Sequence, residues 1–362
     1  MAIQEVFKSD FFEKLIIKLN APKLKNKTNF FRLLAVSQKA GLWLIDSLDS
    51  LGKSEENKGL RIIIKDLISQ LWQWVSLADA MVNHDYFFLI DEVELIRSSQ
   101  VTGNLVQTLY NIAEELENSE KIRNKIKKAL MYPTMLIGIS IIAVAMLLMF
   151  AIPSIVSIFP KDAIPPITVF MMSVSEFLLN SRYILVLLVV WLIVLYKFLY
   201  LNVLPFKIFI DKMAVTLPII GGVVRSSYMY KFSSLLSQFY AAWINPVVSL
   251  QLMSNIFKNF EYKKKAIEIK KDIETWFTFF ESMEWTKLFD PILVQIIHVG
   301  EDTGTITEVL EKISGYYKEQ LQTKIDILLW FLEPFLMIFI AAMIGMIVAS
   351  VFIPMASIVD VI

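Results

Sequence analysis

Few residues in this chain have the types and spacing that catalysis or ligand binding needs. Gly52-Lys53-Ser54 resembles the end of a phosphate-binding loop, but Ser47 stands where that loop requires its first glycine. The preceding residues have the pattern of a helix end, so nucleotide binding is not expected. The 362 residues include 2 histidines and no cysteine, which excludes thiol catalysis and cysteine-bound zinc or iron–sulfur clusters.

The carboxylates near residue 301 are the remaining candidates for ligand chemistry. Glu301 and Asp302 could join Asp290 or Glu308 around a calcium ion, which takes oxygen ligands. Neither histidine has a second histidine four residues away, which is the spacing of a zinc pair on a helix. A Gly-x-Ser-x-Gly nucleophile elbow is also missing from the sequence. We therefore expect no catalytic, cofactor-binding or metal-binding residues, with the oxygen-ligand site near Glu301 left open.

The composition is that of a membrane protein. Hydrophobic residues make up 56% of the chain and charged residues 19%, whereas soluble domains carry roughly 25% charged residues. The mean hydropathy is +0.57. The 35 basic residues are balanced by 35 acidic ones, so a nucleic-acid partner held by net positive charge is not expected.

Three apolar runs predict transmembrane helices. They cover 131–159, 183–204 and 327–359, and each reaches the roughly 20 residues that a helix needs to cross the hydrocarbon core. A buried helix of a soluble protein usually stops at about 10–14 apolar residues. The sequence therefore predicts three membrane spans.

The basic residues set the predicted orientation. Five of them crowd together just before the first run, at Lys121, Arg123, Lys125, Lys127 and Lys128. Because cytoplasmic segments carry the excess of lysine and arginine, we expect 29–130 and 205–326 to be cytoplasmic domains. The 160–182 loop and the 360–362 C-terminus are then periplasmic.

An internal repeat with an offset of 201 residues relates the two halves of the chain. Four pairings share that offset: Val101-Thr102-Gly103 with Asp302-Thr303-Gly304, Tyr132-Pro133 with Glu333-Pro334, Ile152-Pro153 with Ile353-Pro354, and Phe31 and Leu34 with Phe232 and Leu235. Each match is short, and the common offset is what makes the repeat specific. Each unit is a soluble region followed by a span, and the 183–204 span returns the chain to the same side.

Both soluble regions have helical periodicity. Apolar residues recur at three- and four-residue spacing, and strand-like alternation is missing from the sequence. We expect an all-α membrane protein with two repeated cytoplasmic bundles of about six helices each and three transmembrane helices. Gly103 and Gly304 fit the left-handed position that ends a helix, with Asn104 and Thr305 as caps of the next. A direct contact role for these glycines is the alternative.

Two further features have more than one interpretation. Residues 1–28 form an amphipathic segment with Phe7, Phe11 and Phe12 on its apolar side, which fits a membrane surface, the chain's own bundle or a partner. Glu333 precedes Pro334 about 9 Å into the third run, at 1.5 Å per residue. It is either a carboxylate at headgroup depth, or a partner contact or helix-kink site.

These features together resemble the type II secretion protein F family. The resemblance extends from about residue 29 to 358 and is carried by Gly300-Glu301-x-x-Gly304, Tyr132-Pro133, Glu333-Pro334 and Ile353-Pro354. The first unit departs from the family pattern, because Ser99 and Gln100 stand where Gly-Glu is usual. In the second unit, Ala241-Ala242 lacks the glycine of Ala40-Gly41. The chain therefore looks like a divergent, pilus-type member.

The resemblance implies a non-enzymatic platform protein of the bacterial inner membrane, for type IV pilus or type II secretion assembly. The implied partners are a cytoplasmic hexameric secretion ATPase, pilin and minor pilins, other inner-membrane assembly proteins and further copies of the chain. ATPase motions would move the platform, which inserts pilin helices into the filament. The rival functions are an oligomeric transporter or channel subunit, disfavoured by sparse intramembrane polar residues, and a membrane-anchored signalling enzyme, which lacks a catalytic constellation.

Overall fold

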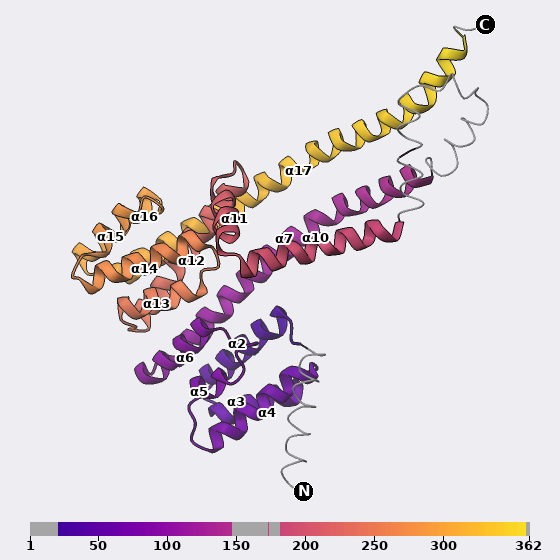
Figure 1. The fold of residues 1–362 in the computed structure, drawn as a ribbon. Helices are drawn as coiled ribbons and strands as arrows, with labels where there is room; N and C mark the ends of the chain where they lie inside the picture. Colours follow the sequence, from indigo (N-terminus) through magenta and orange to yellow (C-terminus); the bar gives the residue numbers. More distant parts are fainter. Residues whose placement is uncertain (1–20, 147–172, 174–181, 360–362) are drawn as a thin grey trace. The chain divides into compact units, whose positions relative to one another are not determined.

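The computed structural model describes residues 21–146, 173 and 182–359, and its secondary structure there is α-helical (Figure 1). The all-α prediction is therefore confirmed for these residues. Phe7, Phe11 and Phe12 lie outside the described residues, as do 360–362 and most of the 160–182 loop.

The first helix series, α2 to α7, occupies residues 24–146. Its bounds are α2 (Leu24–Lys39), α3 (Leu44–Ser54), α4 (Lys58–Trp72), α5 (Leu77–Val82), α6 (Ile90–Thr102) and α7 (Leu105–Met146). Local capping explains several of the starts, because the side chains of Asn57 and Ser76 accept hydrogen bonds from Leu60 N–H and Asp79 N–H.

The second helix series, α12 to α17, repeats this order. Its bounds are α12 (Ile220–Ala241), α13 (Pro246–Ile256), α14 (Phe260–Glu274), α15 (Phe279–Thr286), α16 (Pro291–Thr303) and α17 (Ile306–Val359). Caps again mark the starts of α13, α15 and α16, at Asn245, Thr278 and Asp290. Pro246 and Pro291 occupy the first positions of α13 and α16, where the fixed φ of proline already has a helical value.

The register between the two series changes once along the chain. The helices α3 and α13 begin at residues 44 and 246, and α4 and α14 begin at 58 and 260, a separation of 202. The helices α6 and α16 begin at 90 and 291, a separation of 201. The pairing of Phe31 and Leu34 with Phe232 and Leu235 was therefore wrong by one residue. The buried residues that correspond are Phe30 with Phe232 and Leu34 with Leu236.

Three left-handed backbone positions recur at matching helix ends. Gly103 and Gly304 end α6 and α16 with φ of 72° and 68°, which confirms the prediction for these glycines. Trp74 and Trp276 follow α4 and α14 with φ of 65° and 71°, and both are 96% exposed. Gly41, with φ of 83°, corresponds to Trp243, with φ of 59°. The glycine missing from the second series is thus replaced by tryptophan in the same conformation.

Aromatic side chains form the core of each series. In the first series, Phe30, Phe31, Phe87 and Phe88 meet edge to face or tilted, with ring centroids 4.7 to 6.3 Å apart. In the second series, Tyr228 stacks on Tyr262 at 4.1 Å, and Phe232 lies 4.6 Å from Phe289. Such pairs add about 0.5–1.5 kcal/mol each to the energy of burying their area.

A buried ion pair distinguishes the first core from the second. Lys27 on α2 binds Glu92 on α6, with 2.5 Å between Nζ and Oε2, and both side chains are less than a tenth exposed. Burial raises the pKa of Glu92 to about 7, although the charge of Lys27 opposes that rise. The corresponding positions in the second series are Met229 and Leu293, and both are buried.

The chain divides into two compact units. The first unit contains the two helix series up to residue 124 and from 221 to 322. Within it, α6 packs against α13, the Ser98 hydroxyl donates to the Ala242 carbonyl, and the Tyr230 hydroxyl donates to Glu115. These parts of the two series belong to one compact unit, and their existence as two repeated cytoplasmic bundles stays a prediction.

The second unit contains the described residues within 125–220 and 323–362. In it, α10 (Arg182–Asn202) is followed directly by α11 (Leu204–Thr216), with a bend of 100° between them. The Tyr200 hydroxyl donates to Asp211 at 2.9 Å, which ties α11 to α10. The helix α11 belongs to the second unit, and a cytoplasmic domain over 205–326 stays a prediction.

One helix in the described ranges, over 306–342, is long and apolar enough to cross a membrane, with a mean hydropathy of 2.1 in its apolar window. The bent pair of α10 and α11 is a second candidate if it counts as one span. The predicted first span, 131–159, starts in α7 and continues outside the described residues. Three membrane spans therefore stay a prediction.

Candidate functional site

Glu301 joins the end of α16 to the start of α15. Its Oε1 accepts a hydrogen bond from Phe279 N–H at 2.8 Å, and its Oε2 accepts one from Phe280 N–H at 2.9 Å. The first N–H groups of a helix have no partner within the helix and favour negative charge. Glu301 therefore acts as a clamp that satisfies two of these donors from the neighbouring helix.

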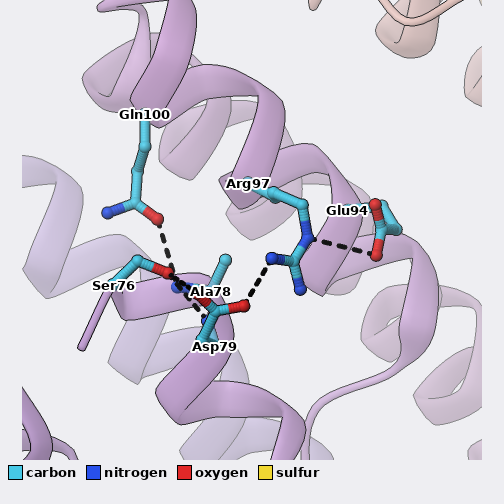
Figure 2. A network of polar contacts seen from close by, with 6 residues as sticks. All are labelled: Ser76, Ala78, Asp79, Glu94, Arg97 and Gln100. Carbon is cyan, nitrogen blue, oxygen red and sulfur yellow. Dashed lines mark hydrogen bonds and ion pairs between the residues drawn. The ribbon is translucent and has the colours of Figure 1, made fainter.

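Gln100 makes the corresponding contact in the first series. Its Oε1 accepts a hydrogen bond from Ala78 N–H at 3.1 Å, at the second residue of α5 (Figure 2). The amide thus keeps one of the two clamp bonds and loses the negative charge. The departure of this position from the family pattern changes the clamp's charge, while the amide still bridges the same two helices.

An ion pair beside the first clamp also joins α6 to the start of α5 (Figure 2). Asp79 accepts hydrogen bonds from the Ser76 hydroxyl and from Arg97, and Arg97 also contacts Glu94 (Figure 2). The Ser76 hydrogen bond and then the Arg97 hydrogen bond lower the pKa of Asp79. Both helices have an acidic residue of their own in the first turn, Asp79 in α5 and Glu281 in α15. The helix α15 receives a second carboxylate, that of Glu301, from α16.

Gly300 allows α16 to approach α17 closely. A Cβ atom at this position would lie 2.6 Å from Val309 Cγ2 and 3.0 Å from Ile306 Cα. The corresponding Ser99 is fully buried, and its hydroxyl donates to the Ile96 carbonyl at 2.8 Å. Glycine is therefore required by packing in the second series, while the first series has room for a side chain.

The oxygen-ligand site near Glu301, which the sequence left open, is not formed by the described residues. Asp290 caps α16 by accepting from Ile292 N–H at 2.9 Å, and Glu308 accepts from Lys312 at 2.7 Å. Asp302 is exposed, and its Oδ2 lies 3.7 Å from Nδ1 of His298. In the described ranges, no group of three or more acidic, histidine or cysteine side chains is placed to hold a metal ion.

The phosphate-loop resemblance has no counterpart in the structure. Gly52, Lys53 and Ser54 lie inside α3, where Lys53 pairs with Asp49 at 2.5 Å. Hydrogen bonding to Asp49 raises the pKa of Lys53. These residues are part of a regular helix with an i,i+4 ion pair.

Tyr132, Pro133 and Glu333 come together at a cavity in the second unit. The cavity has a volume of about 330 Å³ and is lined by α7 and α17: Ala129, Tyr132, Pro133, Leu136, Leu329, Trp330, Glu333, Leu336 and Met337. Pro334 is the next residue of α17 and is not part of the lining. The sequence aligned Tyr132 with Glu333 but gave no sign that they would line one cavity.

A second pair of corresponding residues meets nearby. Lys125 and Asp326 are 201 residues apart in the sequence, and Nζ lies 2.6 Å from Oδ1. Residues at matching positions of α7 and α17 can contact each other when the two helices are related by an approximate two-fold axis that passes near those residues. The common offset related these residues along the sequence, and the structure shows that Lys125 and Asp326 also meet in space.

The family comparison matches both helix series. The sequence model described as type II secretion system (T2SS), protein F, matches residues 30–153 and 232–354. The chain belongs to this family. The two matched segments begin at the corresponding core residues Phe30 and Phe232. They include both clamps and both sides of the α7–α17 cavity.

Individual relatives span most of the chain. The chain is 27% identical over 338 residues to the type IV pilus assembly protein PilC of Pseudomonas aeruginosa. That alignment covers 90% of this chain and 87% of the relative. The PilC protein of Thermus thermophilus is 26% identical, covering 93% and 84%. The type II secretion system protein F of Vibrio cholerae is 25% identical, covering 89% and 80%.

Proposed function

We propose that this chain is a platform protein of the bacterial inner membrane that assembles a type IV pilus or a type II secretion apparatus. The observation that carries the proposal is the family match, which includes both helix series. Relatives named for pilus assembly and for type II secretion align over 89–93% of the chain. The role is structural and not enzymatic, consistent with clamps and ion pairs whose polar groups are used within the fold.

The proposed arrangement keeps the part of each helix series that precedes its apolar run in the cytoplasm. Spans at 131–159, 183–204 and 327–359 would separate 29–130 and 205–326 from a short periplasmic loop and C-terminus. The apolar surface of α17 supports this arrangement, because Phe335 and Ile338 are about 70% exposed and need a nonpolar environment. The first unit would then face a hexameric ATPase, while the second would receive pilin helices from the bilayer.

Cysteine labelling tests the arrangement cleanly because the chain has no cysteine of its own. Single cysteines at Ser119, Ser314 and Val361 are treated with an impermeant maleimide on intact spheroplasts. We expect labelling only at 361, and labelling at all three positions after permeabilisation. Labelling at 314 in intact spheroplasts would show that 205–326 is not cytoplasmic.

Filament assembly tests the function. In a strain lacking the chromosomal copy, the wild-type chain should restore filaments or secretion, whereas Glu333→Gln should insert normally and assemble fewer filaments. Tyr132→Phe is the matched control, because it changes the corresponding residue of α7 while keeping the ring. Filament yield is measured at equal membrane levels of each variant. Full assembly without the chain contradicts the proposal, and solute flux through vesicles that contain it would favour a transporter.

A further inference from the structure

The cavity between α7 and α17 combines one carboxylate with aromatic rings. Glu333 lines it together with Tyr132 and Trp330, and the remaining surface is mostly aliphatic, from residues such as Leu136, Leu336 and Met337. The carboxylate of Glu333 makes no hydrogen bond or ion pair with any residue in the described ranges. A volume of about 330 Å³ is enough for a small group on an apolar chain.

The cations of α7 close to the cavity are not paired with Glu333. Lys125, seven residues before Tyr132 and roughly 10 Å along the helix, is paired with Asp326 at 2.6 Å. Lys128, about one turn before Tyr132, is exposed and makes no ion pair with Glu333 in the described ranges. An uncompensated carboxylate in an apolar segment is unfavourable. The position of Glu333 is therefore explained best by a positive group that comes from outside the chain.

The chemistry of the lining selects the kind of cation. A carboxylate forms a charge-assisted hydrogen bond with an ammonium group, and the faces of tryptophan and tyrosine attract the same group. The aliphatic side chains suit the apolar body to which that group is attached. An anion would be repelled by Glu333, and a neutral ligand would leave the carboxylate uncompensated.

We propose that this cavity binds an ammonium group at the end of an apolar helix, and that the occupant is the free N-terminal amine of an incoming pilin. The inference rests on the proposed function and adds the chemical group by which the platform recognises its substrate. An α-amine has a pKa near 8 and is mostly charged at neutral pH. The positive end of the helix dipole adds to the attraction of Glu333 for a helix that enters with its amino end first.

A lipid amine offers the same head group, and the experiment separates the two sources. The full chain is placed in nanodiscs of phosphatidylglycerol, which has no amine. The probe is a synthetic peptide with the apolar N-terminal segment of the cognate pilin, labelled at its C-terminal end. One form has a free amine and the other an acetylated amine. We expect the free amine to bind about tenfold more tightly than the acetylated form.

Variants of the lining test whether the preference comes from this cavity. Glu333→Gln should bind both peptides equally. Tyr132→Phe, which keeps the ring, should retain the preference, and Trp330→Leu should reduce it. Trp191→Leu is the matched control, because Trp191 is an exposed tryptophan of α10 that is not part of the lining. Adding phosphatidylethanolamine should leave the preference in place.

The outcomes separate this inference from the proposed function. Equal binding of the two peptides by the wild type overturns the ammonium site but leaves pilin binding intact. A preference that survives Glu333→Gln overturns it as well. Loss of the preference on adding phosphatidylethanolamine would assign the site to lipid and overturn the pilin amine as its occupant. Failure of both peptides to bind contradicts both the inference and the role of the cavity in receiving pilin.

Discussion

The two helix series have the same backbone plan and place charge in different parts of it. The first series has a charged core, with Lys27 paired to Glu92, and a neutral clamp at Gln100. The second has an apolar core, with Met229 and Leu293 at the same places, and a charged clamp at Glu301.

Either set of residues can therefore support the same backbone, provided that the buried polar groups have hydrogen-bond or ionic partners and that side chains fill the core. A buried ion pair and two well-packed apolar side chains are often close in stability, because desolvation offsets the attraction of the charges. An amide and a carboxylate can likewise both accept from the start of a helix. The predictions that follow exchange residues between the two series, beginning with the largest expected effect.

Replacing one member of the buried pair should have the largest effect. Glu92→Leu leaves Lys27 buried without its partner, and we expect a loss of about 3–5 kcal/mol in the free energy of unfolding. The double variant Lys27→Met, Glu92→Leu copies the second series and should recover most of that loss. Hydrogen exchange of α6 measures the effect, with α16 as the internal reference. Equal exchange of α6 in the single and double variants would contradict this account.

The same pair should make stability depend on pH. Burial raises the pKa of Glu92 from 4.5 to about 7, so the folded chain holds this proton more tightly than the unfolded chain. Its stabilising contribution is then complete below about pH 4.5 and is lost as the pH rises through about 7. Melting curves of the wild type and the Met–Leu double variant, compared between pH 5 and 8, should diverge in that direction. A constant difference would show that Glu92 does not titrate there.

The contact of α16 with α17 should accept no side chain at residue 300. Gly300→Ser places a Cβ within 3.0 Å of the Ile306 backbone, and we expect a loss of about 2–3 kcal/mol. The reverse exchange in the first series, Ser99→Gly, should cost less than about 1 kcal/mol. Thermal melts of both variants test this asymmetry. A mild effect at Gly300 would mean that α16 and α17 can move apart.

The charged clamp should contribute more than the neutral one. Glu301→Ala removes two hydrogen bonds to a carboxylate, for a loss of about 2 kcal/mol, whereas Gln100→Ala removes one neutral bond, for about 1 kcal/mol. Local hydrogen exchange at the starts of α15 and α5 measures each loss. Glu301→Gln should fall between the two. If Gln100→Ala proves the more damaging, the ranking of the clamps by charge is wrong.

The smallest expected effect is a gain. Trp243 holds a left-handed conformation that glycine adopts freely, and Gly41 fills the corresponding place. Trp243→Gly should stabilise the chain by about 0.5–1 kcal/mol, since relief of strain exceeds the added freedom of the unfolded chain. Gly41→Trp should have the opposite sign. A destabilised Trp243→Gly variant would mean that the indole makes contacts that compensate for its strained backbone.

Local features of the sequence determined the helices and the way they end. Gly103 and Gly304 were predicted in the left-handed position because only glycine adopts it freely, and helical periodicity predicted both helix series. The register of α2 against α12 was misplaced because Phe30-Phe31 in α2 and Leu235-Leu236 in α12 are pairs of identical neighbours. A shift of one residue therefore still aligns apolar positions, and only the helix ends show the correct pairing.

Tertiary structure alone decided which distant residues meet. Glu301 clamps a helix that begins 22 residues earlier, Lys27 pairs with a carboxylate 65 positions away, and Tyr132 shares a cavity with Glu333. A sequence shows periodicity and caps because these depend on near neighbours along the chain. Contacts between helices depend on how whole helices pack, and no residue pattern within one helix encodes its partner.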